Sequence, residues 1–254
     1  MQRMHALTAA FLTLAAAAAS AGDDKLTVQF NQCTEFVGLA PIDALKARAA
    51  LPARYSLISD AAGARLVVRA VDCAAVQVGH GPARKGRVAQ IGLLIASPDG
   101  TGTDPNTSIN NYTLTYASDS PALVEALRES GVPAVLDESL AIEVNPPSGT
   151  GSSYYAGVAG GKGGADAWFL QGTVNTPGFA TQFLANWWRL NGVKETKMAT
   201  DIPAISFDFA SQMRFSTSRL NSVGQLLGSN LVAGFPLSFR GAFAAGTMVV
   251  TVSR

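Results

Sequence analysis

Apolar and polar positions alternate along the chain in a way that predicts a protein built mainly of β-strands. Within residues 25–30 every second side chain is apolar, which is the pattern of a strand with one buried face. Residues 112–116 alternate in the same manner, whereas residues 88–96 are almost continuously apolar, as in a strand buried on both faces. The same reasoning predicts strands over residues 64–71, 76–78, 167–174, 205–209 and 248–252.

Helical patterns are fewer than strand patterns. The clearest covers residues 120–130, where Asp119 or Ser120 can cap the helix, Pro121 suits its first turn and Gly131 follows its last. The leucines and alanines of this segment form one apolar stripe. Shorter helices are predicted over residues 42–49, directly after Pro41, over residues 180–190, which include Phe183, Trp187 and Trp188, and over residues 220–227.

Two segments rich in turn-forming residues separate these elements. Residues 97–111 contain Pro, Asp, Gly, Thr and Asn, and residues 145–164 contain two prolines and a dense run of Gly and Ser. The second segment is either a loop or a domain linker, and we interpret it as a loop because strand patterns resume on both sides. Many short strands with a few helices predict a β-rich α+β fold, either a single curved sheet or a closed β-barrel with flanking helices.

The first residues have the layout of a cleavable secretory signal peptide. Arg3 lies in a short positive segment, an uncharged stretch of about 13 residues rich in Ala and Leu follows, and small residues end the segment at Ala21. An N-terminal membrane anchor is the alternative, but a spanning helix needs roughly 20 apolar residues. We therefore predict a signal peptide over residues 1–21 and a single barrel-like domain over residues 22–254, secreted or periplasmic.

The charge balance bears on the class of partner. The chain has 19 Lys and Arg against 18 Asp and Glu, so its sequence gives no electrostatic argument for binding nucleic acid or an anionic membrane surface. No segment after the signal peptide is long and apolar enough to span a bilayer. The partner that the sequence favours is a small apolar molecule, and the oligomeric state stays open.

The chain contains two cysteines, Cys33 and Cys73. In an oxidising compartment an isolated pair most simply forms one disulfide, and two buried thiols are the alternative. A disulfide would close a loop of about 40 residues and contribute roughly 4 kcal/mol in the chain-entropy description. A metal site is disfavoured, because signal cleavage leaves His80 as the one histidine and this set of residues has no zinc-binding spacing.

Familiar catalytic signatures are missing from the sequence. His80 is the one candidate base for a serine triad, and its place in a turn of Gly and Pro is more typical of a solvated histidine. The Gly-rich segment around Lys162 superficially resembles a phosphate-binding loop, but Gly163 stands where such a loop requires Ser or Thr. The carboxylates do not identify an acid and base pair. We predict no cofactor and no metal.

The order of elements along residues 25–144 matches a known family pattern. A strand over residues 36–40 precedes the helix at residues 42–49, which runs into a Leu-Pro-x-x-Tyr turn at residues 51–55. A buried strand, a loop and another strand then lead to a helix that ends in Gly-Val-Pro-Ala at residues 131–134. This order resembles the acetoacetate decarboxylase superfamily, whose members end the last helix in a Gly-aromatic-Pro-Lys turn. The resemblance implies a β-barrel with an internal cavity.

Two positions depart from that pattern. In the enzymes of the superfamily the lysine of the turn forms a Schiff base with the keto acid, whereas this chain has Ala134 there. A glutamate expected on the preceding buried strand is replaced by Gln90. The resemblance therefore implies that classical acetoacetate decarboxylase activity is absent, because an alanine cannot form an imine. We take Gln90, Tyr112, Ala134 and Trp187 as candidate cavity residues, although core packing is the more typical role for the tryptophan.

Three functions are compatible with the sequence. The first is a barrel that binds a small, largely apolar molecule. The second is an enzyme with altered acetoacetate decarboxylase-like chemistry in the same cavity, and the third is a structural or interaction protein of the cell envelope. An apolar cavity favours the first, convergent polar groups at Gln90 favour the second, and a barrel filled by its own side chains favours the third. The sequence does not identify a ligand.

Overall fold

The computed structural model describes residues 24–145, 152–158, 167–174, 178–209, 212–233, 235 and 237–253. The signal peptide predicted over residues 1–21 and the segment around Lys162 lie outside these residues. In chain order the described strands and helices are β1 Asp24–Ile42, α1 Ala44–Ala50, β2 Ser59–Asp60, β3 Gly63–Val78, β4 Arg84–Leu94, β5 Ser108–Ser118, α2 Pro121–Glu129, β6 Ala134–Leu136, β7 Ala141–Asn145, β8 Ser152–Val158, β9 Trp168–Val174, β10 Ala180–Asn191, β11 Lys194–Asp208, β12 Gln212–Thr217, α3 Ser222–Leu227, β13 Leu231–Ala233 and β14 Leu237–Ser253.

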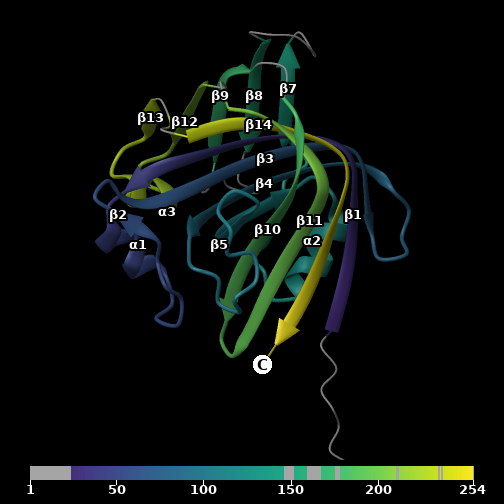
Figure 1. Ribbon diagram of the computed structural model, residues 1–254, viewed down its shortest axis with the longest axis horizontal. Helices are drawn as coiled ribbons and strands as arrows, with labels where there is room; N and C mark the ends of the chain where they lie inside the picture. Colours follow the sequence, from purple (N-terminus) through teal and green to yellow (C-terminus); the bar gives the residue numbers. More distant parts are fainter. Residues whose placement is uncertain are drawn as a thin grey trace, which may run out of the picture.

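Long, strongly curved strands close into a β-barrel (Figure 1). Counted over the described residues, it has 7 strands in the order β1, β14, β11, β10, β5, β4 and β3, and β3 pairs back with β1. Neighbouring strands are antiparallel except β5 and β10, which are parallel. The predicted β-rich fold with a closed barrel is confirmed, and closure pairs both edges of each barrel strand.

A second sheet covers part of the outside of the barrel, at the top of Figure 1. It contains β13, β12, β9, β8 and β7 in that order. Its apolar side chains join those of α1, α3 and the outer faces of β3 and β4 in one cluster. For example, Phe36 of β1 stacks on Tyr154 of β8 with ring centroids 4.2 Å apart. Several barrel strands are therefore buried on both faces, which explains their nearly continuous apolar sequences.

The inside of the barrel holds a separate apolar cluster. It includes Val67 and Val71 of β3, Phe243 of β14 and side chains of α2, which packs against this interior. Neighbouring residues on a strand point to opposite faces. For this reason Trp187 of β10 belongs to the inner cluster, whereas Trp188 belongs to the outer one.

The predicted disulfide joins Cys33 of β1 to Cys73 of β3. The two residues are direct partners in the pairing of these strands, and both are buried inside the barrel. Because β1 and β3 are the strands whose pairing closes the barrel, the disulfide links the barrel covalently at its closure.

Residues 180–190 belong to β10 and not to the helix expected from the sequence. Central residues of β10 are buried on both faces, so apolar side chains follow one another without the alternation of a half-buried strand. Periodicity alone cannot distinguish such a run from a buried helix. The aromatic residues Phe183, Trp187 and Trp188 are types that favour strands, which is the signal the expectation neglected.

Two further segments differ from expectation. Residues 152–158, expected to belong to a loop, form β8, in which alternate residues from Tyr154 onward face the core. The Ser and Gly residues of this segment hide that period of two in the sequence. The first helix begins at Ala44, later than expected, because the side chain of Asp43 caps it by accepting hydrogen bonds from two backbone N–H groups.

The other helices agree with the sequence analysis. The helix predicted over residues 120–130 is α2, whose cap is Ser120, and Gly131 follows it with a φ of 88°, a left-handed conformation that favours glycine. The helix predicted over residues 220–227 is α3. Of the helices that the structure describes, none combines the length and the apolar character needed to cross a bilayer.

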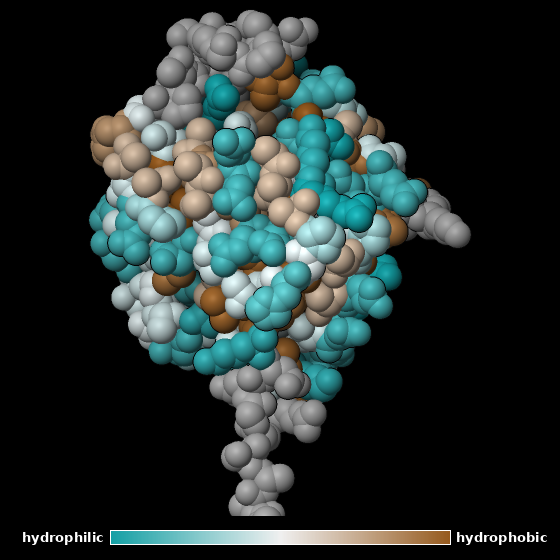
Figure 2. All heavy atoms as spheres, turned by 90° about the vertical axis from the view of Figure 1, so that its right-hand side faces the viewer, coloured by the Kyte–Doolittle hydropathy of each residue, from teal (hydrophilic) through white to brown (hydrophobic). Residues whose placement is uncertain are grey.

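One side of the molecular surface is largely hydrophilic (Figure 2). This is the side on which β1 and the β3–β4 hairpin lie in Figure 1. Hydrophilic and intermediate residues predominate there, and the apolar ones are scattered among them. This face therefore presents no broad apolar area.

Candidate functional site

Four neighbouring strands bring one row of buried residues together inside the barrel. Arg69 of β3 pairs in register with Gln90 of β4, Gln90 pairs with Tyr116 of β5, and Tyr116 pairs with Ala134 of β6. Their exposed fractions are 9%, 1%, 1% and 2%. Register partners in a sheet project to the same face, so these four side chains form a continuous row, of which three are polar.

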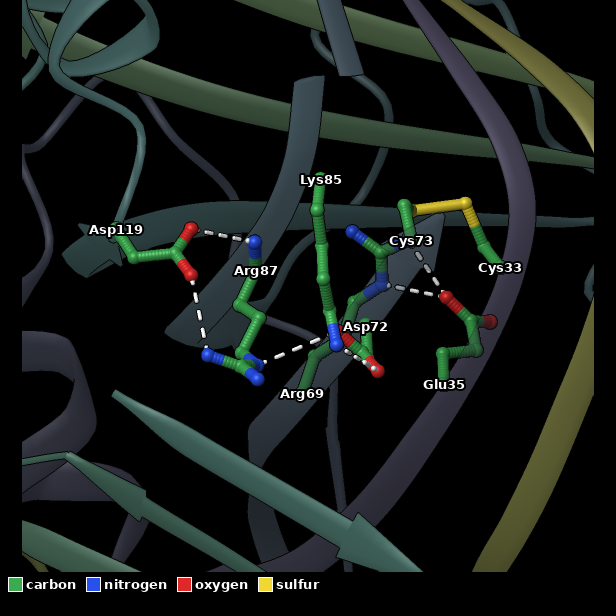
Figure 3. Close-up of a disulfide and its surroundings, with 8 residues drawn as sticks. All are labelled: Cys33, Glu35, Arg69, Asp72, Cys73, Lys85, Arg87 and Asp119. Carbon is green, nitrogen blue, oxygen red and sulfur yellow. Dashed lines mark hydrogen bonds and ion pairs between the residues drawn. A yellow bond between two sulfur atoms is a disulfide. The ribbon is translucent and has the colours of Figure 1, made fainter. Parts of the chain in front are cut away.

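A carboxylate from β1 completes the polar part of this row (Figure 3). Glu35 accepts a hydrogen bond of 2.8 Å from Nε of Arg69 and forms an ion pair of 2.6 Å with its Nη2. Nη1 of Arg69 donates to Oε1 of Gln90 at 2.7 Å. All three guanidinium nitrogens therefore have a partner, and the buried positive charge is balanced by a buried negative one. Gly241 of β14 provides the space, since a Cβ there would lie 2.8 Å from the side chain of Glu35.

Tyr116 supplies an uncharged hydroxyl to the same row. Burial raises the pKa of Tyr116 well above its ordinary value, and the nearby Arg69 lowers it by less. The phenol therefore keeps its proton throughout the physiological range. In this environment Tyr116 can take part in hydrogen bonds but does not supply a phenolate base.

A narrow cavity of about 20 Å³ lies beside Glu35 and Arg69. That volume accommodates about one water-sized group. Most of its walls are apolar, and they come from five barrel strands. The lining residues are Glu35, Val37, Val67, Arg69, Ile109, Asn111, Phe183, Ala185, Trp187 and Phe239.

Two neutral polar side chains of this cavity lack hydrogen-bond partners among the described residues. They are Asn111 of β5, both of whose amide atoms are buried and unpaired, and Trp187 of β10, whose indole Nε1 is buried and unpaired. The two residues are register partners in the parallel pairing of β5 and β10. A buried polar group without a partner costs about 1–3 kcal/mol, so a hydrogen-bonding group placed in this cavity would relieve a cost that the pair carries.

Aromatic rings lead from this cavity to the surface. Phe183 and Phe239 line the cavity, and each lies near the ring of Phe207, with centroids 5.4 Å and 5.0 Å away. Phe209 packs against Phe207 and Phe239 and is 62% exposed. We call these four phenylalanines the aromatic cluster. It forms the apolar side of the cavity that faces solvent.

Gly92 of β4 allows Trp187 to occupy its place in the barrel. A Cβ at Gly92 would lie 2.7 Å from the indole ring and 2.6 Å from the carbonyl oxygen of Tyr112. We therefore expect Gly92→Ala to lower the free energy of unfolding by about 1–3 kcal/mol, since the ring or the strand must move.

Urea unfolding followed by circular dichroism measures this effect. The matched control is Gly178→Ala, where the nearest atom to a Cβ is 3.4 Å away and the contact is ordinary. Equal unfolding midpoints for the two variants would show that the ring of Trp187 does not depend on Gly92.

The structure distributes the four candidate cavity residues over two faces. Gln90 and Ala134 belong to the buried row, and Trp187 lines the cavity. Tyr112 belongs to the outer cluster, where its ring lies 5.0 Å from that of Tyr55. Tyr116 is the tyrosine beside Gln90, because a register shift in β5 between the two tyrosines changes which residues face inward.

Sequence reasoning missed Glu35, Arg69 and Asn111. A signal for the first two was present: Glu35 lies two residues after Cys33, and Arg69 lies four before Cys73. With a period of two, each must share the face of its cysteine, so the predicted disulfide already placed a carboxylate and a guanidinium close together. Asn111 carried no comparable signal, since it stood at the end of an expected loop.

A second group of charges lies on the other face of β3 (Figure 3). Asp72 pairs with Arg87 at 3.3 Å and with Lys85 at 3.8 Å, and Arg87 also pairs with Asp119 at 3.3 Å. These side chains are partly exposed, so each pair contributes little to stability. Within the described part of the chain, no group of three or more His, Cys, Asp or Glu could hold a metal ion.

Comparison with known proteins adds information on the fold. No family model matches the sequence, and no curated protein matches it significantly. Solved structures do match. Acetoacetate decarboxylase from Legionella pneumophila has a TM-score of 0.58 and 12% identity, covering 89% of this chain and 87% of its own. This chain has the acetoacetate decarboxylase-like fold.

Two other structures have the same acetoacetate decarboxylase-like fold. An acetoacetate decarboxylase-like enzyme from Sphingomonas wittichii RW1 has a TM-score of 0.51 and 15% identity, covering 98% of this chain and all of its own (100%). The enduracididine biosynthesis enzyme MppR, complexed with pyruvate, has a TM-score of 0.54 and 11% identity, covering 93% and 91%. Identities this low establish the fold alone, so the function must be argued from the residues of the site.

Proposed function

We propose that the barrel binds a small, largely apolar molecule in the cavity between β1, β3, β5, β10 and β14. The observation that carries this proposal is the pair Asn111 and Trp187, whose buried polar atoms are unpaired in an otherwise mainly apolar cavity. A ligand with one polar group would satisfy these atoms and bury its apolar part against the walls.

The size of the cavity sets a condition on this proposal, because a barrel so nearly filled by its own side chains would by itself favour a structural or interaction protein. About 20 Å³ does not accommodate a ligand larger than a water molecule, so Phe183 and Phe239 must turn aside when one binds. Phe183 is only partly buried, and Phe209 behind them is 62% exposed. Outward rotation of Phe239, which is 8% exposed, must also displace Phe207 and Phe209 toward solvent.

A second candidate function is an enzyme with altered acetoacetate decarboxylase-like chemistry. The observation that favours it is the row of Glu35, Arg69 and Gln90 beside the cavity, because a buried ion pair next to a ligand can position a substrate or stabilise developing charge. Ala134 supplies no amine for a Schiff base. We therefore expect no covalent adduct after borohydride treatment in the presence of a keto acid. A keto acid trapped on one of the described lysines would show that Schiff-base chemistry is possible without an amine at position 134.

We further propose that the chain works outside the cytoplasm. Its support is the signal-like sequence of residues 1–21 together with the buried Cys33–Cys73 disulfide. Disulfides of this structural type persist in oxidising compartments and are rare in the cytosol. N-terminal sequencing of the protein from its own host should start at Gly22, and a chain that begins at Met1 would contradict the proposed cleavage.

Native mass spectrometry tests the binding proposal. Protein purified gently from its own host should carry a small molecule that is released when the protein unfolds. Asn111→Leu should retain less of it, and Asn31→Leu, at an exposed position of β1, should retain as much as the unchanged chain. Absence of any retained small molecule from the unchanged protein would count against ligand binding.

A further inference from the structure

The charges of the cavity are already balanced before a ligand arrives. Glu35 and Arg69 are the two ionisable residues among those that line it. The three nitrogens of the Arg69 guanidinium are held by Glu35 and Gln90. A ligand carboxylate that approached Arg69 would also approach the carboxylate of Glu35, and it would lose its own hydration without gaining an unpaired cation.

The groups that lack partners are neutral. The amide of Asn111 offers both a donor and an acceptor, and the indole of Trp187 offers one donor. Their strands place the two residues next to each other. A head group that both accepts and donates hydrogen bonds, such as a primary carboxamide or an alcohol, can complement this pair. An anionic carboxylate only accepts, so it would leave the amide oxygen of Asn111 unpaired.

The remaining walls determine the body of the ligand. Phe183 and Phe239 line the cavity with aromatic rings, and Val37, Val67 and Ile109 line it with branched aliphatic groups. Aromatic side chains pack favourably against other rings at centroid separations of 4.5–7 Å. These walls favour a flat aromatic or compact branched body over a flexible polar one.

We propose that the barrel selects electrically neutral molecules that carry an aromatic or branched apolar body and one carboxamide or hydroxyl head, and that it rejects carboxylates. This inference rests on the proposed binding function and specifies its ligand class. Asn111 and Trp187 are the specificity-determining residues for the head. The ion pair of Glu35 and Arg69 is the reason that an anion gains nothing at this position.

Matched pairs of probes test this inference on the protein as purified from its own host. Benzamide and benzoate share a shape but differ in charge, as do isobutyramide and isobutyrate, and toluene supplies the apolar body without a head. The indole Nε1–H signal of Trp187 in a nitrogen–proton correlation spectrum, assigned with Trp187→Phe, reports occupation of the cavity. We expect each amide to bind at least about tenfold more tightly than its carboxylate, which corresponds to one unmatched hydrogen-bonding group.

Two variants separate the contributions of head and charge. Asn111→Leu should weaken the binding of benzamide about tenfold and leave the binding of toluene nearly unchanged. It should also raise the stability of the ligand-free protein, because an unpaired buried amide is removed. Glu35→Gln should move the preference toward benzoate, since Arg69 then carries an unbalanced charge. If Glu35→Gln does not fold, the unchanged protein and Asn111→Leu still decide the result.

The outcomes separate this inference from the function on which it rests. Equal or tighter binding of the carboxylates at the Trp187 signal would overturn selection for neutral molecules and leave ligand binding intact. An equal loss of affinity for benzamide and for toluene in Asn111→Leu would overturn the role assigned to the side-chain amide of Asn111. Failure of all five probes to shift the Trp187 signal, with no molecule retained from the native host, would overturn both proposals.

Discussion

Arg69→Met is expected to lower the free energy of unfolding by about 3–5 kcal/mol, one of the largest effects of any single substitution in this protein. The side chain of Glu35 is 5% exposed and receives both its short contacts from Arg69. Removing the guanidinium leaves a carboxylate inside the barrel without a counter-charge, and it also removes the donor to Gln90. Burial of an uncompensated charge, rather than loss of the attraction itself, accounts for most of this cost.

Urea unfolding measures the effect, with Arg65→Met as the matched control on the same strand. Arg65 pairs with Asp60, whose side chain is 62% exposed. Arg65→Met should therefore lower the free energy of unfolding by less than about 1 kcal/mol. The double variant Glu35→Leu with Arg69→Met removes both charges and should be less destabilised than Arg69→Met alone. A double variant as unstable as the sum of the single ones would show that the pair does not act as one buried unit.

Loss of the Cys33–Cys73 disulfide is expected to destabilise the protein by about 4 kcal/mol. The crosslink closes a loop with a sequence separation of 40 residues and joins the strands that close the barrel. Without it the unfolded chain gains the freedom to separate these two residues, and refolding must give up that additional entropy. Unfolding in urea with and without a thiol reductant measures the difference.

Cys33→Ala combined with Cys73→Ala provides the control for the disulfide. Its unfolding midpoint should match that of the reduced protein to within the small packing loss of two sulfur atoms, and it should not respond to reductant. Identical unfolding of the oxidised and reduced protein would contradict a stabilising role. This result would also weaken the case for export, which the disulfide supports.

Much of the fold followed from local patterns that the sequence displays. The alternation at residues 25–30, the buried run at residues 88–96 and the capped helix at residues 120–130 all correspond to observed elements. The lengths of strands were harder to predict. In β1 the buried positions are even-numbered before Gln32, at Val28 and Phe30, and odd-numbered after it, at Cys33 and Glu35. The change occurs at Gln32, whose φ is 50°. A change of phase of this kind interrupts the period of two, so one strand resembles two separate segments in the sequence.

The candidate site was less predictable because its residues meet through strand pairing. Gln90 and Ala134 were found through their places in a family pattern, and the register that sets them beside Tyr116 depends on a shift in β5. Asn111 lies beside Trp187 in the cavity because β5 and β10 pair in parallel. More than 70 residues separate these two side chains in the sequence, as they do for the neighbouring hydrogen-bonded pair Asn110 and Asn186. No local pattern encodes a contact over such a separation.

A crystal structure of the protein purified from its own host tests most directly the claim that the barrel interior is a ligand site. We predict electron density for a small molecule whose polar head lies within hydrogen-bond distance of the Asn111 amide and whose apolar body separates the rings of Phe183 and Phe239. The contradicting result is a barrel in which these rings close over the cavity of about 20 Å³ and at most one water molecule bonds to Asn111.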